Sequence, residues 1–289
     1  MKMDPLLDEF RVDSNRLRRL LDLLETINVF SGEENKGIGI EDSSFVAQAE
    51  RVLKNSKECH PDLVILTGTL VPYLSGRFEY FVRAEFEFLC ERIAVRCGNY
   101  RNLPREMRDS IVTMTAKVIA EPRKYGHGDQ GVKSFIANLA SILNDSSKLQ
   151  DVNSACLSVT DANMRADMLN DLFQRIGAKG IWDKIGQQAK VQVFFETAEG
   201  GEARNKAQSF LNTFMDIRNR IAHPSVGIDW PDSSQVKKYI EFFEILAQAI
   251  SEIMNIYEIQ LSKGAQQIAG GQGAPSTNPP MPSVQIERT

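Results

Sequence analysis

Apolar residues recur every three or four positions along most of the chain, which is the spacing of one face of an α-helix. The first such stripe follows Asp13-Ser14-Asn15, a sequence rich in helix-capping side chains. Its members are Leu17, Leu20, Leu21, Leu24 and Ile27. No stretch alternates apolar and polar residues with a period of two for long enough to predict a strand. We therefore expect an all-α fold.

Further helices are expected wherever this spacing continues between residues that begin or end a helix. The longest covers residues 63–96; it contains Pro72, which should bend it, and many aromatic residues, which should be buried. Gly177 is a natural stop for a helix over 161–176. The other expected helices cover residues 44–53, 104 onward (with Pro104 as the first helical residue), 131–143, 203–223 and 233–261.

The composition changes at Gly264. The last 26 residues contain four glycines, four prolines and no aromatic residue. Such a segment cannot bury enough surface to offset the entropy lost on ordering it. We expect three parts: an N-terminal helical extension at 1–58, a helical domain at 59–262 and a disordered tail at 263–289.

Composition and charge then narrow the class of protein. With 42% hydrophobic and 25% charged residues, the chain is typical of a soluble globular protein. The net charge of −4 argues against holding nucleic acid by bulk electrostatics alone. No window of ~18 residues lacks charge, so no membrane span or membrane partner is expected. The four cysteines and three histidines form no CxxC pair and no cluster at zinc-ligand spacing. Together with the absence of a signal-peptide run, this predicts a cytoplasmic protein with reduced thiols and no metal.

Residues 208–230 carry the strongest candidate for chemistry, and read QSFLNTFMDIRNRIAHPSVGIDW. On a helical wheel, the residues that form a core face within about 40° are Phe210, Phe214, Ile217 and Ile221. Arg218 lies about 65° from that face, Asn219 about 165° from it, and His223 nearly opposite. Because Pro224 disfavours helical geometry at the residue before it, the helix should end at His223 and leave the imidazole exposed.

The run Arg218-Asn219-Arg220-Ile221-Ala222-His223 resembles the signature of the HEPN superfamily, in which a polar residue and then a histidine follow an arginine. Other stretches are similar to the RiboL-PSP branch of that superfamily. They are 77–81, which includes Glu79, then 163–173 leading to Gly177, and the last helix at 236–250. The resemblance covers roughly residues 60–262 and implies a HEPN-like antiparallel helical bundle.

The resemblance further implies a metal-independent endoribonuclease without a cofactor, whose two protomers bring their motifs together. Arg218 would contact two phosphate oxygens and His223 would transfer protons, with Asn219 as the polar member of the motif. Glu79 would orient a histidine, or alternatively be solvated or paired with Arg77. On one helix Arg218 and His223 are ~140° apart, and a site completed by a second chain would resolve this separation.

RNA is thus the expected substrate and a homodimer the expected assembly, in bacterial defence or a toxin-like stress response. A regulatory or antitoxin protein is a further candidate partner. The stretch 92–108 has five arginines against one acid, so it is the best local candidate for an RNA-backbone surface. The candidate RNA contacts are Arg96, Arg101, Arg105 and, within the motif, Arg220. The loop containing Arg123, Lys124 and His127 is a weaker candidate for phosphate contact.

Two alternatives remain open at the level of the sequence. Arg218 and His223 could form an ordinary polar edge and helix end, since a cation near a helix C-terminus is favourable by itself. The same fold could also serve as a non-catalytic scaffold that binds RNA or protein. The chain also departs from some family members, with Ser225 in place of a tyrosine that accepts AMP, and Pro224 in place of the more usual glycine.

Overall fold

The computed structural model describes residues 4–32, 43–144, 149, 151–223 and 229–270, and over these residues the chain is helical with no strand, which confirms the expected all-α fold. The α-helices are α1 (Pro5–Gly32), α2 (Ser43–Cys59), α3 (Leu63–Cys97), α4 (Arg105–Ala120), α5 (Asp129–Leu143), α6 (Ser154–Leu157), α7 (Ala166–Gln174), α8 (Ile181–Gly186), α9 (Ala189–Phe194), α10 (Gly200–Ala222) and α11 (Ser233–Gly270). Short 3-10 helices lie at η1 (His60–Asp62), η2 (Tyr100–Asn102) and η3 (Pro122–Tyr125). None of the helices in these ranges is both long and apolar enough to cross a bilayer.

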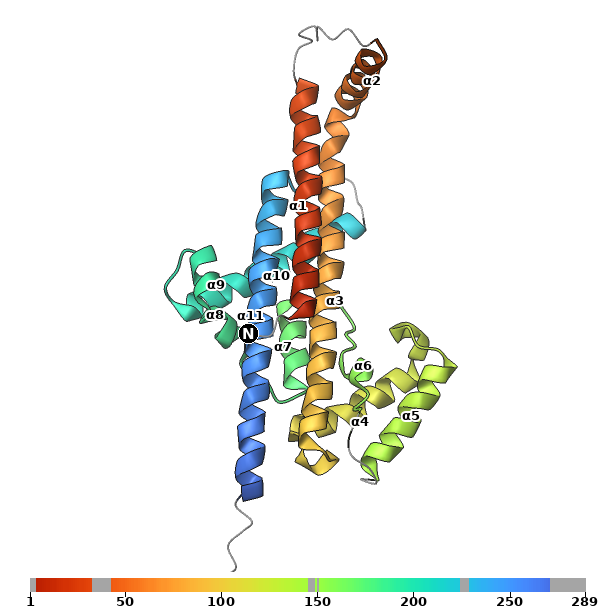
Figure 1. The fold of residues 1–289 in the computed structure, drawn as a ribbon, viewed down its shortest axis with the longest axis vertical. Coiled ribbons are helices and arrows are strands. Elements are labelled where there is room, and N and C mark those ends of the chain that lie inside the picture. The colour runs from red at the N-terminus through yellow and green to blue at the C-terminus, as the bar shows by residue number, and fades with distance from the viewer. Residues whose placement is uncertain (1–3, 33–42, 145–148, 150, 224–228, 271–289) are drawn as a thin grey trace, which may run out of the picture.

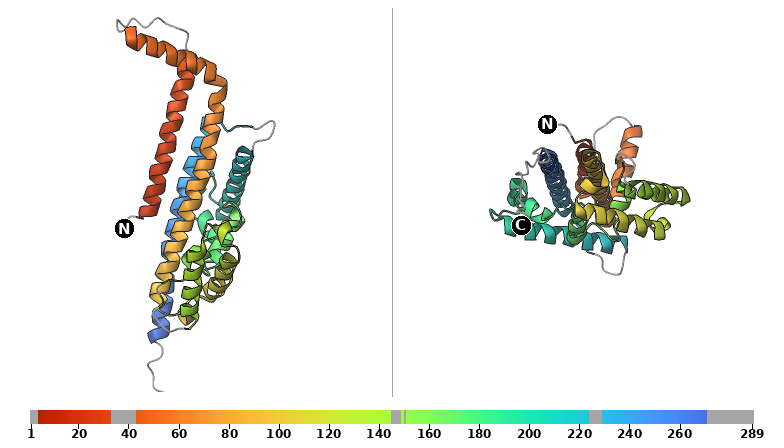
Figure 2. Two further views of the ribbon diagram at one scale, coloured as in Figure 1. Left: turned by 90° about the vertical axis from the view of Figure 1, so that its right-hand side faces the viewer. Right: turned by 90° about the horizontal axis from the view of Figure 1, so that it is seen from below.

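Three long helices, α1, α3 and α11, run side by side along the molecule (Figures 1 and 2). Aromatic rings join them: Phe78 of α3 lies 4.6 Å from Phe243 of α11, and Phe10 of α1 lies 5.5 Å from Phe81 of α3, between ring centroids. Part of the apolar stripe of α1 is therefore covered within the same chain, whereas Leu20 is 47% exposed. Its residues Leu17 and Leu21 are fully buried. The first helix of the predicted N-terminal extension thus belongs to the common core.

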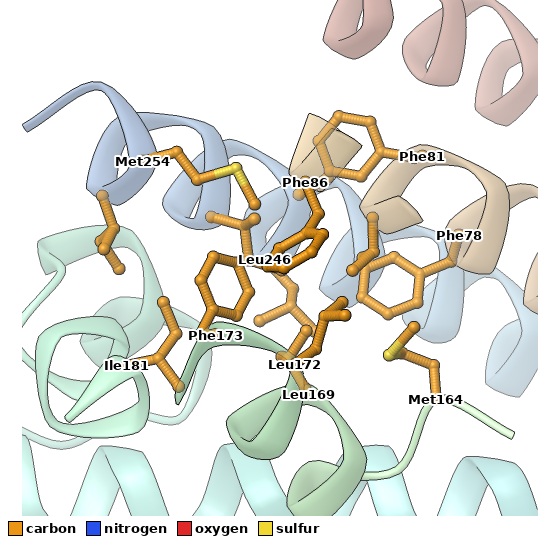
Figure 3. Close-up of a cluster of buried hydrophobic side chains, with 14 of the residues drawn as sticks. Phe78, Phe81, Phe86, Met164, Leu169, Leu172, Phe173, Ile181, Leu246 and Met254 are labelled. Carbon is orange, nitrogen blue, oxygen red and sulfur yellow. The ribbon is translucent and has the colours of Figure 1, made fainter. Parts of the chain in front are cut away.

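The remaining helices pack around α3. The lobe of α4, α5 and α6 lies on one side, and α8 and α9 lie on the other, next to α10 and α11 (Figure 1). Between them, Phe173 of α7 meets Phe86 of α3 edge to face, with Leu246 of α11 beside them (Figure 3). α10 runs along α3 as well, and this contact sets the position of the R-N-x-x-A-H motif.

Two boundaries differ from expectation. The helix expected over 161–176 begins only at Ala166, because the backbone at Arg165 is extended and Asp161 is held by side chains of the α4–α5 region. It ends as expected, with Gly177 in the left-handed conformation at φ 83°. α11 continues to Gly270 through residues where disorder was expected, since the alanines and glutamines at 265–269 favour helix. Residues 271–289 lie outside the described part of the chain.

The remaining helices begin and end close to the expected residues, with three exceptions. α1 begins as early as Pro5, α2 continues to Cys59, and Pro104 precedes α4 as its N-cap rather than forming its first residue. α3 runs without interruption through Pro72. The predicted early stripe, the long aromatic helix and the late pair of helices are all present.

Candidate functional site

The motif occupies the last turn of α10. This helix buries Leu211, Phe214 and Met215 against the core, so the opposite face carries its polar residues. The helix ends at Ala222, and the His223 backbone leaves helical geometry at φ −125° and ψ 72° while its N–H still donates to the Asn219 carbonyl at 3.0 Å. The His223 side chain is exposed. The imidazole therefore lies at the tip of the helix, open to a substrate or to a second chain.

Arg218 is held by a short network of amides. Its Nη1 donates to Oδ1 of Asn219 at 3.3 Å, and the same oxygen accepts a hydrogen bond from Nδ2 of Asn163 at 2.5 Å. Asn163 lies in the segment before α7, 56 residues earlier in the chain. Because both bonds use Oδ1, the Asn219 amide group has one orientation, and the guanidinium beside it is fixed.

The charge of Arg218 is not neutralised by the described residues, since none of their carboxylates lies within 4 Å of it. Its Nε is buried and has no hydrogen-bond partner there. A half-buried guanidinium without a counterion is an unfavourable arrangement for a structural residue alone, because desolvation costs free energy that no ion pair offsets. The arrangement suits a group that binds an anion.

Residues 158–165, called here the strap, run beside α3 and connect it to the motif (Figure 1). The backbone N–H of Met164 donates to Oε1 of Glu79 at 3.3 Å, and the Met164 side chain is buried next to Phe78 (Figure 3). Because Asn163 precedes Met164 directly, the strap places Glu79 one residue away from the contact with Asn219.

The other end of the strap is tied to α3 and to the basic loop. Nη2 of Arg83 donates to Oγ1 of Thr160 at 2.5 Å. Asp161 pairs with Lys117 and Lys124 and accepts a hydrogen bond from the Tyr125 hydroxyl at 2.7 Å. The hydrogen bonds from Lys117, first, and Tyr125 hold the pKa of Asp161 well below its usual range. Asp161 is therefore an ionised anchor for the loop rather than a proton donor.

The family model of RiboL-PSP-HEPN matches residues 41–255, about three quarters of the chain. The chain belongs to this family. No curated protein and no solved structure gave a significant match. The match includes the motif, the strap and Glu79, whereas α1 lies outside it although it packs against α3.

Within this RiboL-PSP-HEPN protein, Glu79 is not paired with Arg77. Its hydrogen bond goes to the Met164 backbone, and Arg77 instead pairs with Glu9, at 2.6 Å, and with Asp13. Glu79 thus positions the strap, and through it the amide network of the motif. Its part in orienting a histidine stays a prediction.

The arginine-rich stretch of the domain lies elsewhere. Arg96 is 17 residues beyond Glu79 on α3, which corresponds to about 25 Å along the helix. Arg92 and Arg96 both pair with the buried Glu258 of α11, Arg92 at 3.0 Å, and Arg105 lies 3.8 Å from Asp109. Arg101 is exposed near the end of α3 and Arg220 is exposed on the last turn of α10. Of the four predicted RNA contacts, the structure thus brings only Arg220 to the motif.

Sequence reasoning missed Asn163, Thr160 and Arg83 as site residues. They are far from the motif in the chain, and no spacing rule connects them with it. The polar run before Met164 was expected to be helical, and its true role follows from the long-range hydrogen bonds. Among the described residues, no group of three or more His, Cys, Asp or Glu side chains that could hold a metal ion comes together.

Proposed function

We propose that this RiboL-PSP-HEPN protein is a metal-independent endoribonuclease that cleaves RNA with Arg218, Asn219 and His223 at a homodimer interface. The observation that carries the proposal is the fixed guanidinium of Arg218, held by the amide network and without a carboxylate among the described residues. Such a cation matches the charge of a phosphodiester and the larger charge on its transition state.

The reaction that these groups suit is attack by the ribose 2′-hydroxyl. A histidine accepts the 2′-hydroxyl proton, the 2′-oxygen bonds to the neighbouring phosphorus, and the bond from phosphorus to the 5′-oxygen breaks. The same histidine, now protonated, gives that proton to the departing oxygen. The products are a 2′,3′-cyclic phosphate and a 5′-hydroxyl, and histidine titrates near neutral pH, as both steps require. Arg218 would stabilise the negative charge that builds on the phosphorane oxygens.

A second protomer would supply what one chain lacks. Arg218 and His223 are ~140° apart on one helix, so one chain does not readily present both to the same phosphate. Mixing Arg218→Ala protein with His223→Ala protein tests this arrangement. If each site combines Arg218 of one protomer with His223 of the other, random pairing should restore about a quarter of wild-type activity from two inactive proteins. Sites contained within one chain would restore none.

Cleavage of a labelled single-stranded RNA by the wild type and by His223→Ala, both in EDTA, tests the activity itself. Arg51→Ala, at an exposed position on α2, is the matched control. We expect cleavage by the wild type and the control, and none by His223→Ala. Equal cleavage by all three proteins would refute the assigned motif, and RNA binding without cleavage by any would favour the non-catalytic scaffold.

We place this activity in bacterial defence or a toxin-like stress response. Expression of the wild type in a bacterial host should then arrest growth, and expression of His223→Ala at the same level should not. Equal growth under the two conditions would contradict this assignment.

A further inference from the structure

A groove on α3 lies directly beside the strap. It has a volume of about 330 Å³, within the usual range for sites that bind small ligands. The residues that line it follow one face of the helix and are Gly76, Glu79, Tyr80, Arg83, Ala84 and Glu87. Glu79 belongs both to this groove and to the strap contact, and Asn163 connects the strap with Asn219. A nucleotide in the groove would therefore be a close neighbour of a phosphate at Arg218.

The charges of the groove favour a nucleobase over the phosphate backbone. Two glutamates face one arginine, so the lining is net negative and would repel phosphates. Each carboxylate uses one oxygen on the strap: Glu79 accepts from the Met164 N–H, and Glu87 accepts from the Ser158 hydroxyl. The second oxygen of each is left to accept hydrogen bonds from the amino and imino groups of a base.

Arg83 adds donors to these acceptors. Nη2 bonds Thr160, and no carboxylate of the described residues lies within 4 Å of the guanidinium, whose remaining terminal N–H groups are therefore without a counterion. The guanidinium therefore has donors left for the carbonyl oxygen and ring nitrogen of a purine.

Tyr80 supplies a stacking surface. Its side chain is half exposed, and the Arg77 guanidinium lies over the ring at 4.9 Å from the centroid. This contact covers one face of the ring and holds it in place, which leaves the other face for an unstacked base.

We propose that this groove binds a guanine base of single-stranded RNA, stacked on Tyr80, with its acceptor edge on Arg83 and its N–H groups on the glutamates. Guanine is the base that presents an acceptor pair to arginine together with N–H donors, whereas uracil has no amino group. The proposal deepens the ribonuclease function proposed above, because it rests on that function for the identity of the ligand as RNA. It predicts a guanine next to the cleaved bond.

The test measures binding of RNA that cannot be cleaved, so that it does not depend on activity. Fluorescence anisotropy is used with two labelled 2′-O-methyl octanucleotides, one of uridines only and one with a single central guanosine. We expect the wild type to bind the guanosine oligonucleotide about tenfold more tightly. The control Arg51→Gln should keep this preference.

Gly76→Leu is the most informative variant. A Cβ at this position would meet no atom within 4 Å, and leucine is a better helix former than glycine, so the variant should fold and be at least as stable as the wild type. Its side chain would fill the groove, and the guanosine preference should fall to near unity. Arg83→Gln and Glu87→Gln should each weaken the preference at least threefold.

Thr160→Val separates recognition from support of the strap. It removes the hydrogen bond from Arg83 and leaves the guanidinium in place, so the guanosine preference should persist. Loss of the preference in Thr160→Val as fully as in Arg83→Gln would mean that Arg83 acts only through the strap, and would overturn its assigned role.

Different results would contradict the groove proposal and the ribonuclease proposal. If the wild type shows no guanosine preference, or if Gly76→Leu retains it, the groove proposal is overturned even when RNA is cleaved. A preference that Gly76→Leu abolishes in a protein that cleaves no RNA would support the groove and refute the nuclease.

Discussion

The buried carboxyl of Glu85 should make the stability of the protein fall as the pH rises. Glu85 lies on α3 with only 3% of its surface exposed. It faces Asp4, the residue that caps α1, and Asp4 in turn accepts a hydrogen bond from Ser251 of α11. Burial, first, and the hydrogen bond with Asp4 raise the pKa of Glu85 to about 8, although Arg92 opposes this rise. Glu85 is therefore protonated in the folded protein at neutral pH.

The direction in which the folding stability changes with pH follows from proton linkage. Because the pKa is higher in the folded chain than the ordinary value of 4.5, Glu85 contributes stability below pH 4.5 that is lost as the pH rises through 8. The rise corresponds to roughly 5 kcal/mol in total, at about 1.4 kcal/mol per pH unit, and most of that is lost between pH 5 and pH 8. This is a large fraction of the stability of a typical domain.

Glu85→Gln removes the titration and keeps a neutral side chain that can donate to Asp4. Urea denaturation of wild type and variant at several values between pH 5 and pH 8 gives the difference in unfolding free energy at each pH. We expect this difference to shift steadily in favour of Glu85→Gln as the pH rises. Glu241→Gln, at an exposed position on α11, is the control. A difference that stays constant from pH 5 to pH 8 would refute a protonated Glu85.

Three further outcomes test the packing and the site. Gly68→Ala would place a Cβ 2.3 Å from Cε3 of Trp230, so the ring must move. We expect the free energy of unfolding to fall by about 1–3 kcal/mol and the tryptophan fluorescence to change. An unchanged fluorescence spectrum would contradict the contact. Asn163→Ala removes the hydrogen bond that Asn163 donates to Oδ1 of Asn219 at 2.5 Å. It should lower kcat for RNA cleavage about three- to tenfold with little change in KM. An effect on KM alone would argue against a positioning role. Arg218→Lys keeps the charge but not the two-pronged contact, so cleavage should fall at least about tenfold, and wild-type rates would show that charge alone suffices.

The helices were predictable where burial and helical geometry coincide. Phe78 and Phe81 of α3 and Phe214 of α10 are buried on the faces that their spacing indicates. The start of α7 was not predictable in this way. Met164 fits the same apolar spacing and is fully buried, yet it lies in the non-helical strap. Apolar spacing indicates which residues face the core. It does not by itself establish that the backbone between those residues is helical.

The motif could be found from the sequence because its residues lie close together in the chain, whereas the groups that fix it could not. Asn163 bonds Asn219 across 56 residues, and Arg83 bonds Thr160 across 77. The arginine-rich stretch shows the same limit. A count of charges does not reveal that Arg92 and Arg96 meet Glu258 from the last helix.

The most direct test of the account is end-group analysis of a single-stranded RNA incubated in EDTA with wild type, Arg218→Ala or His223→Ala. We expect that only the wild type gives fragments, with 2′,3′-cyclic phosphate and 5′-hydroxyl groups at the newly formed ends. Fragments with the same ends and in the same yield from all three proteins would contradict it.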